Sequence, residues 1–395
     1  RDAVDGYLAG GPSSRADRRM LSNPRVGRVV EAGGMRRLVA ALGIALVAAT
    51  LLGSAPFWLA GMQVARAGSP PLVGFSFSPR TAEWLGEKPE PALTELLSRL
   101  TPDLVRLPIY WDTVEPRRDA FDFSSPDGLL NVVRHYNSTH LTRPAHVVLE
   151  VGMRNMGFPE LYIPSWVPGD ESIETMTANP EYMQYLNLSV TRYRRDPLLY
   201  SWQLENEPLD NVPTTEGTQV DIPGDVLQDE KAALVMLDPN HEVVITTYNS
   251  STLDLDMKAL SPKNATGEQQ DGPQPVGHPL EALQLGDALG MDLYVVTSDT
   301  SLEDATARVR TDWKKAALSY WASQARAVHK SLWITEMQGA PWPGETNFTP
   351  DDLLYSARLY RTSTAGVILL WGVESWLTSP KWIDAGVEAR RIVGV

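Results

Sequence analysis

Eight short apolar runs, separated by longer amphipathic or polar segments, constrain the fold of this chain most strongly. They lie at 72–77, 104–109, 146–151, 199–204, 243–248, 291–296, 332–335 and 366–371. Most of them are continuously apolar instead of alternating, which is typical of parallel strands that are covered on both faces. We therefore predict eight parallel strands.

Segments with a helical spacing of apolar residues lie between these runs, at 91–100, 127–136, 312–329 and 350–360. Asp127 and Asp312 are the expected N-caps of two of them. A strand followed by a helix, repeated eight times in about 320 residues, predicts an α/β domain of the (β/α)8 TIM-barrel type. Insertions at 211–224 and 261–278 lengthen it. An open doubly wound sheet is the alternative, but Phe77-Ser-Pro-Arg80 stands where a glycine-rich phosphate loop would follow the first strand.

The N-terminal part of the chain has a different composition. Residues 1–37 hold eight Arg against four acidic residues, and 38–65 contain no charged residue. A span of that length can cross a bilayer, which needs about 20 apolar residues, with its basic flank on the cytoplasmic side. We divide the chain into a basic tail at 1–37, a signal peptide or transmembrane anchor at 38–67, and the barrel domain at 68–395. The tail is either cytoplasmic or the product of a start extended too far upstream.

Two interpretations of the segment 38–67 stay open. Met35-Arg-Arg37, the apolar core and Ala65-Arg-Ala67 as a small-x-small cleavage site are typical of a signal peptide. Left uncleaved, the same segment would anchor the domain to the membrane. Both interpretations predict an extracytoplasmic domain, secreted or anchored to the cell membrane.

Charge and composition exclude several classes of function. The net charge of −14 argues against a nucleic acid as partner, because its phosphates repel an acidic protein. The absence of Cys excludes disulfides, thiolate metal sites and a Cys nucleophile. The six His show no metal-ligand spacing, and no Gly-x-Ser-x-Gly elbow of a serine hydrolase occurs. We expect neither a metal nor a cofactor.

Two glutamates stand at the ends of predicted strands. Tyr200-Ser-Trp-Gln-Leu-Glu-Asn-Glu-Pro208 contains Glu207, and Leu332-Trp-Ile-Thr-Glu336 ends in Glu336. The C-terminal ends of barrel strands meet at one face, so carboxylates distant in sequence can face each other there. Cleavage of a glycosidic bond needs one carboxyl that gives up a proton and one that stays ionised.

The order of several motifs along the chain resembles glycoside hydrolase clan A, which includes the family 5 cellulases and mannanases. The likeness begins with Asn206-Glu207-Pro208 after an apolar strand, the acid/base motif of the clan. It covers about residues 72–385 and extends to Arg106 in the second strand, Trp111 with Val114-Glu-Pro116 and Phe121-Asp-Phe123 after it, Tyr294 in the sixth strand, Glu336 in the seventh and Trp371 in the eighth.

The resemblance implies a role for each of these residues. Glu207 would be the general acid/base and Glu336 the nucleophile of a retaining glycoside hydrolase, which works through a covalent glycosyl-enzyme. The sugar would be bound by Asn206, Arg106, Tyr294, Trp371, Trp111 and Trp342. Asn206 would contact the 2-hydroxyl, and Trp342, in Ala340-Pro-Trp-Pro343, would be a second stacking platform after Trp371. β-Glucan or mannan is the substrate that the family 5 likeness suggests.

Several alternatives remain open at this point. Glu205 is a rival of Glu207, and Trp111 fits the core equally well. Glu150 and Arg154 either contact sugar or form an ion pair, and Asp292 stands where family 5 members commonly have His. The alternatives in function are a non-catalytic carbohydrate-binding TIM barrel and a cell-surface transglycosylase.

Overall fold

The computed structural model describes residues 70–157, 160–168, 173–210, 212–213, 219–248, 278–293, 318–341 and 348–394. All of them belong to one compact unit, 60–395. The predicted tail and apolar segment at 1–67 lie outside the described residues. Within the part of the chain that the structure describes, no helix is both long enough and apolar enough to span a bilayer.

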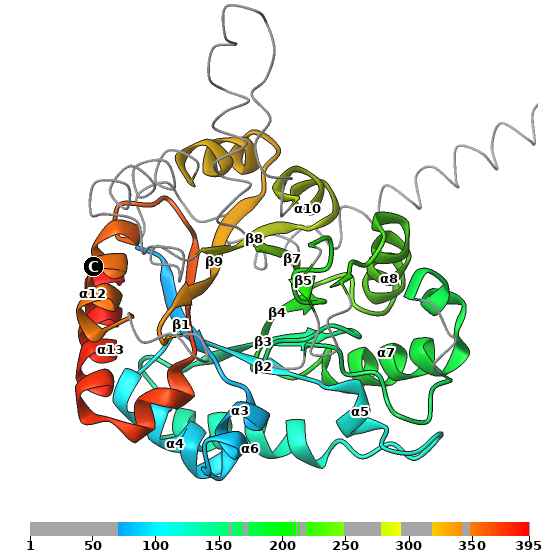
Figure 1. The fold of residues 1–395 in the computed structure, drawn as a ribbon, viewed down its shortest axis with the longest axis horizontal. Coiled ribbons are helices and arrows are strands. Elements are labelled where there is room, and N and C mark those ends of the chain that lie inside the picture. The colour runs from blue at the N-terminus through cyan, green and yellow to red at the C-terminus, as the bar shows by residue number, and fades with distance from the viewer. Residues whose placement is uncertain are drawn as a thin grey trace, which may run out of the picture. The chain divides into compact units, whose positions relative to one another are not determined.

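Eight parallel strands close into a barrel in the order β1-β10-β9-β8-β7-β4-β3-β2 (Figure 1). Every neighbouring pair is parallel. The strands are β1 Leu72–Ser76, β2 Leu104–Pro108, β3 His146–Val151, β4 Leu199–Leu204, β7 Val243–Tyr248, β8 Ala288–Leu293, β9 Ser331–Gln338 and β10 Val367–Trp371. The predicted TIM barrel is therefore confirmed.

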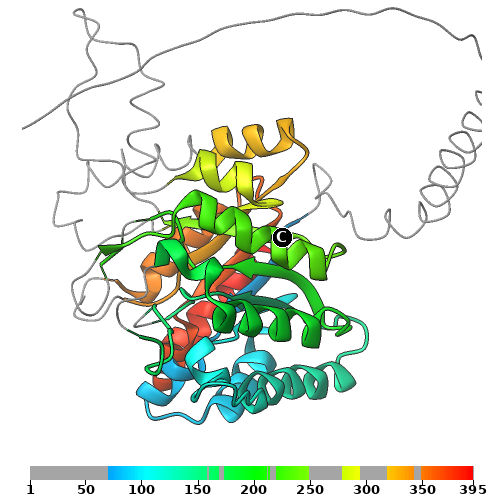
Figure 2. The same ribbon diagram turned by 90° about the vertical axis from the view of Figure 1, so that its right-hand side faces the viewer.

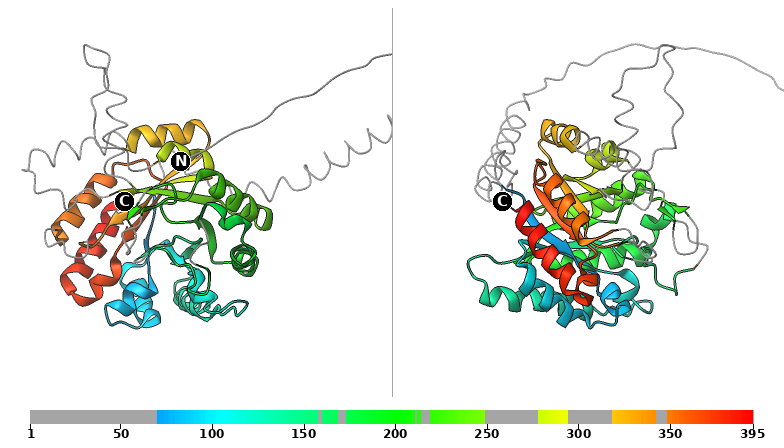
Figure 3. Two further views of the ribbon diagram at one scale, coloured as in Figure 1. Left: turned by 45° about the vertical axis from the view of Figure 1, so that its right-hand side comes forward. Right: turned by 60° about the vertical axis from the view of Figure 1, so that its left-hand side comes forward.

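Helices surround the barrel, as expected where each crossover connects two parallel strands. Helices α7 and α8 pack together along one side (Figure 2), and α12 packs on α13 at another (Figure 3). The helices are α3 Pro79–Trp84, α4 Pro89–Leu100, α5 Trp111–Val114, α6 Ser124–Thr139, α7 Pro180–Tyr193, α8 Gly224–Leu237, α10 Pro279–Leu285, α12 Pro350–Tyr360 and α13 Pro380–Val393, with the 3₁₀ helices η1 Ile173–Ala178 and η3 Val373–Thr378.

The predicted elements differ from the observed ones mainly at their ends. Three strands have the predicted limits, whereas β8 begins earlier, at Ala288, and β9 extends beyond the predicted end to Gln338. Asp127 is not an N-cap, because α6 begins three residues before it, and its carboxylate accepts a hydrogen bond from Tyr193 instead. Asp312 lies outside the described residues.

The predicted insertion at 211–224 contains two short antiparallel strands, β5 Val212–Pro213 and β6 Gln219–Val220, and its last residue already begins α8. Of the predicted insertion at 261–278, only His278 is described. Both insertions follow the C-terminal ends of barrel strands, where the loops of this fold carry function.

The interior of the barrel has two layers. An apolar layer fills the end where the strands begin, and its members are Leu104, Val148, Val244, Ala288, Trp333, Val367 and Leu369. A polar layer follows at the C-terminal end, and its members are Ser76, Arg106, Glu150, Gln203, Thr246, Asp292 and Glu336, all nearly or fully buried. The apolar layer supports this polar cluster from below, so the fold places the chemistry at one end of the barrel.

Candidate active site

Strand β9 delivers Glu336 to the barrel interior through a bulge. Ile334 pairs with Met291 of β8, but the next residue of β8, Asp292, pairs with Glu336, so Thr335 is an extra residue. Thr335 also points inward, because a Cβ on Gly290 would lie 2.8 Å from its Oγ1. A bulge of this kind re-aims side chains that strict alternation would place on opposite faces. Two consecutive residues of β9 therefore face the interior.

Arg106 of β2 is fully buried and joins the inward polar groups of four strands. Its guanidinium donates to Glu336 Oε1 at 2.6 Å, to Ser76 Oγ at 2.8 Å and to Gln203 Oε1 at 2.9 Å. Its Nε also lies 3.8 Å from Glu150 Oε2. Burial on its own would lower the pKa of Arg106, but the carboxylates of Glu336 and Glu150 raise it above its ordinary value. This cation keeps Glu336 next to a permanent positive charge.

The turn after β4 carries Glu207 in an unusual backbone conformation. Glu205 has φ 60° and Glu207 has φ 45°, values that residues other than glycine rarely adopt. The backbone N–H of Glu207 donates to Thr246 Oγ1 at 2.8 Å, and Arg154 donates to its carbonyl oxygen at 2.7 Å. Such conformations persist where the surrounding contacts fix them, and they concentrate at functional sites.

Glu205 points to the other side of this turn and fixes the loop after β3. Its carboxylate accepts hydrogen bonds from the backbone N–H groups of Met153 and Arg154, at 2.7 and 2.5 Å, and from the Tyr182 hydroxyl at 3.0 Å. Gly152 lies directly beneath it with φ +139°, and a Cβ there would meet the carboxyl carbon at 2.2 Å. Glu205 is thus a buried structural clamp, which leaves Glu207 as the carboxyl of this turn that faces the barrel.

Glu150 and Arg154 pair with other residues. Glu150 lies against Arg106, as described above, and Arg154 donates to Glu160 Oε2 at 3.1 Å. Arg154 also donates to the carbonyl oxygen of Asp210 at 2.9 Å, so it holds both ends of the segment 207–210. Burial raises the pKa of Glu150 to about 8, although Arg106 lowers it. Both residues therefore support the site from within the protein.

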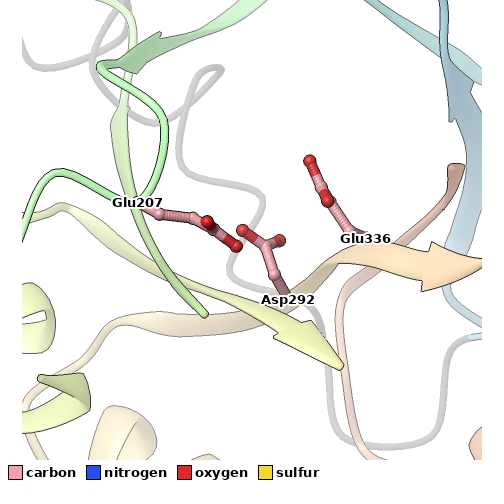
Figure 4. Close-up of side chains that lie close together, drawn as sticks. All are labelled: Glu207, Asp292 and Glu336. Atoms are coloured by element: carbon pink, nitrogen blue, oxygen red, sulfur yellow. The ribbon is translucent and has the colours of Figure 1, made fainter. Parts of the chain in front are cut away.

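Three carboxyl groups meet at the centre of the polar layer. One oxygen each of Glu207, Asp292 and Glu336 lies within 4.8 Å of the others. Figure 4 shows Asp292 between the two glutamates, with its carboxyl directed toward Glu207. Burial raises the pKa of Glu207 well above its ordinary value, and Asp292 and Glu336 raise it further. The environments of the two glutamates therefore differ: Glu336 has a cation at 2.6 Å, and Glu207 faces carboxyl groups.

The predicted sugar-binding residues separate into three groups. Arg106 lies in the polar layer, and Asn206 lies next to it in the turn after β4, where it accepts a hydrogen bond from Gln203 at 3.3 Å. Trp371 is half-buried at the end of β10. Trp111 is not at the site: it is fully buried and stacks on Tyr185 at 5.7 Å, so no face of its indole is free for a sugar. Tyr294 and Trp342 lie outside the described residues.

Asp292 is the member of the site that sequence reasoning did not include. In the sequence it stands out only as a departure from the family 5 pattern. The sequence still contains a signal for its position. Ala288, Gly290 and Asp292 alternate along β8 and therefore share one face, and Ala288 and Gly290 face the interior. We assign no metal ion to the three carboxyl groups, because Arg106 already neutralises Glu336 and an acidic cluster alone does not define a cation site.

A closed parallel barrel with inward carboxyl groups at its C-terminal end is the arrangement of many TIM-barrel enzymes. Comparisons with solved structures agree at the level of fold. GH5_18 from Streptomyces cattleya, crystallised in complex with GlcNAc, superposes with a TM-score of 0.60 at 14% identity over 82% of this chain and 80% of that one. A GH5_18 variant from Bifidobacterium longum subsp. longum, in complex with Manβ1-4GlcNAc, gives 0.54 at 15% identity over 81% and 78%.

A β-galactosidase from the haloarchaeon Halorubrum lacusprofundi gives a TM-score of 0.52 at 12% identity over 81% of this chain and 57% of that one. The barrel thus has the fold of the clan A glycoside hydrolases, as the sequence resemblance predicts. No family model matches the sequence. No curated protein matches it either.

Proposed function

We propose that this protein is a retaining glycoside hydrolase that cleaves O-glycosidic bonds of an oligo- or polysaccharide by double displacement. The observation that carries the proposal is the pair formed by Glu207 and Glu336. Their nearest carboxyl oxygens lie within 4.8 Å, which fits the short carboxyl separation of retaining enzymes, about 5–5.5 Å, better than the wider one of inverting enzymes.

The surroundings of the two glutamates support opposite roles. Arg106 donates to Glu336 at 2.6 Å and so places a positive charge beside the carboxyl group that would be the nucleophile. Burial and the neighbouring carboxyl groups raise the pKa of Glu207, which favours the protonated form that a general acid needs. In the first step, Glu336 attacks the anomeric carbon while Glu207 protonates the leaving oxygen. In the second step, Glu207 takes a proton from water while the water oxygen attacks the anomeric carbon and breaks the ester bond to Glu336, which releases the sugar with net retention.

Two further residues would position the sugar. Asn206 is adjacent to Glu207 and would hydrogen-bond the 2-hydroxyl, a contact that strengthens in the transition state. Trp371 ends β10 and is half-buried, so its indole would stack on the sugar ring. The resemblance to family 5 favours a β-linked glucan or mannan. The GlcNAc and Manβ1-4GlcNAc complexes of the GH5_18 proteins add β-mannosides and N-acetylglucosaminides to the candidates.

We also propose that the barrel acts outside the cytoplasm. The support is the uncharged segment 38–65 with its basic flank at 1–37, which fits a signal peptide or a membrane anchor. Fractionation of the producing cells, with mass spectrometry of the mature N-terminus, tests this point. Recovery of the intact chain in the cytoplasmic fraction would contradict it.

The experiment for the activity uses the full chain and a panel of 4-nitrophenyl β-glycosides of mannose, glucose, galactose and N-acetylglucosamine. We expect hydrolysis of at least one of them, with the β-anomer as the first product in proton NMR. Glu336→Gln should abolish turnover. Release of the α-anomer first, or full activity of Glu336→Gln, would contradict the mechanism. A folded protein that binds these sugars without turnover would instead be a carbohydrate-binding barrel.

A further inference from the structure

Asp292 is a buried acid that forms no direct ion pair with any of the described residues, since the nearby Arg106 pairs with Glu336 instead. Its side chain is fully buried, and neither of its carboxyl oxygens has a hydrogen-bond partner of good geometry among the described residues. Burial raises the pKa of Asp292 well above its ordinary value and Glu336 raises it further, although Arg106, the Thr335 hydroxyl and Glu207 lower it. A buried carboxylate that is neither paired nor protonated is strongly unfavourable. The group must therefore hold a proton or share one.

Glu207 is the partner that geometry offers. Figure 4 shows the two carboxyl groups directed toward each other, whereas Glu336 is already bound to Arg106. Two carboxyl groups at this separation in a buried site do not both ionise, because the like charges repel and water does not screen them. A single proton between them removes one charge and supplies a hydrogen bond.

We propose that Asp292 and Glu207 form a carboxyl pair that retains one proton in the resting protein, with Asp292 as a positioning residue for the acid. This inference rests on the proposed function only for its kinetic consequence. The proton on the pair is the one that Glu207 delivers to the leaving group. Both carboxyl groups of the pair are then ionised only while Glu336 is esterified and uncharged, and Glu207 recovers a proton from the water that displaces Glu336. Asp292 itself does not touch the substrate.

Other charged groups surround the pair and are common to all variants compared below. Asp210 lies in the loop after β4, with the His278 imidazole 3.7 Å from its carboxylate, and Glu160 is paired with Arg154. On the opposite side, Arg106 lies between Glu336 and Glu150. Of these groups, Arg106 is the one that offers the pair a positive charge from within the barrel, and it already lies against the carboxyl groups of Glu336 and Glu150.

The pair predicts a change in the pH profile. In Asp292→Asn, Glu207 loses a neighbouring carboxyl group, so its pKa falls and the basic limb of kcat/KM moves to lower pH by about 1 unit or more. Glu230→Gln is the matched control. Glu230 is also fully buried on α8, but its neighbours are Glu205 and Tyr182, so its removal leaves the basic limb in place. A merely structural role of Asp292 would lower the rate without moving the limb.

A second readout needs no turnover. A carboxyl pair with a raised pKa stabilises the folded state below the unfolded pKa of about 4, and this contribution is lost as the pH rises through the folded value. The midpoint of urea unfolding should therefore fall less between about pH 5 and about pH 8 in Asp292→Asn than in wild type. Glu207→Gln should show the same reduction, since it removes the other partner, and it also serves if Asp292→Asn fails to fold.

The carboxyl pair and the proposed function are contradicted by different results. An unchanged pH dependence of unfolding in both variants, or an unchanged basic limb in Asp292→Asn, overturns the pair. Stoichiometric binding of Mg²⁺, Ca²⁺, Mn²⁺ or Zn²⁺ to wild type that Asp292→Asn abolishes also overturns it, because the carboxyl groups would then hold a cation instead of a proton. If wild type cleaves no glycoside, the proposed function fails, while the unfolding experiment still decides the pair.

Discussion

Within the polar layer, we expect the replacement of Arg106 by Met to lower the stability of the protein most. Arg106 and Glu336 are almost completely buried and lie 2.6 Å apart. At an effective dielectric constant of about 20, their attraction is about 6 kcal/mol before the desolvation of both ions is subtracted. Met keeps most of the volume but leaves Glu336 and Glu150 in the barrel without a cation. Removing one partner of a buried pair costs about 3–5 kcal/mol, and we expect that loss in the free energy of unfolding.

Urea unfolding at neutral pH measures this loss, and Arg391→Met is the matched control. Arg391 also lies 2.6 Å from a carboxylate, that of Glu388, but both side chains are largely exposed, so its replacement should leave stability almost unchanged. In a Glu336→Gln background, the effect of Arg106→Met should shrink, because one uncompensated charge is already gone. A loss below about 1 kcal/mol for Arg106→Met, or an equal loss in both backgrounds, would refute the reasoning.

Three further substitutions test the site. Glu207→Gln should lower kcat about 10²–10⁴-fold on substrates with poor leaving groups, and much less on activated aryl glycosides, as steady-state kinetics can show. Glu205→Gln should lower the free energy of unfolding by about 1–3 kcal/mol, since it weakens the clamp on Met153 and Arg154, while the basic limb of the pH profile stays in place. Trp371→Ala should raise KM for oligosaccharides more than it changes stability, because its indole is only half-buried; an unchanged KM would exclude it as a platform.

The strands were predictable where they are continuously apolar. The limits of β3, β4 and β7 agree with the prediction, and each of these strands presents apolar side chains to the surrounding helices. Strand β8 begins earlier than predicted because Gly290 interrupts the apolar pattern. A side chain does not fit there, since a Cβ would lie 2.8 Å from Thr246 and Thr335.

The polar end of the barrel was harder to predict. Strand β9 continues through Glu336 to Gln338, polar residues that a sequence pattern assigns to a loop, because the barrel interior accepts them next to Arg106. The bulge at Thr335 depends on pairing with β8 and β10 and has no local signal. The family motif that contains Trp111 predicts a contact with sugar. In the structure two residues of this motif bond to each other in the core, where the Trp111 indole donates to Glu115 at 2.8 Å.

The residue pair Glu207 and Glu336 came from the strand-end positions together with the family likeness, and the structure brings both to one place. The family likeness does not indicate Asp292, because this residue stands where family 5 members commonly have His. The period of two along β8 would have placed it inside the barrel. Tyr294 and Trp342 remain predictions.

Trapping of the covalent intermediate tests the central claim most directly. The full chain is incubated with activated 2-deoxy-2-fluoro β-glycosides of the same four sugars, and the adduct is located by intact mass and peptide mapping. We predict one adduct on Glu336 with at least one sugar, and none in Glu336→Gln. An adduct on another residue, or hydrolysis of a β-glycoside with inversion and without any adduct, would contradict the assignment of Glu336 as nucleophile.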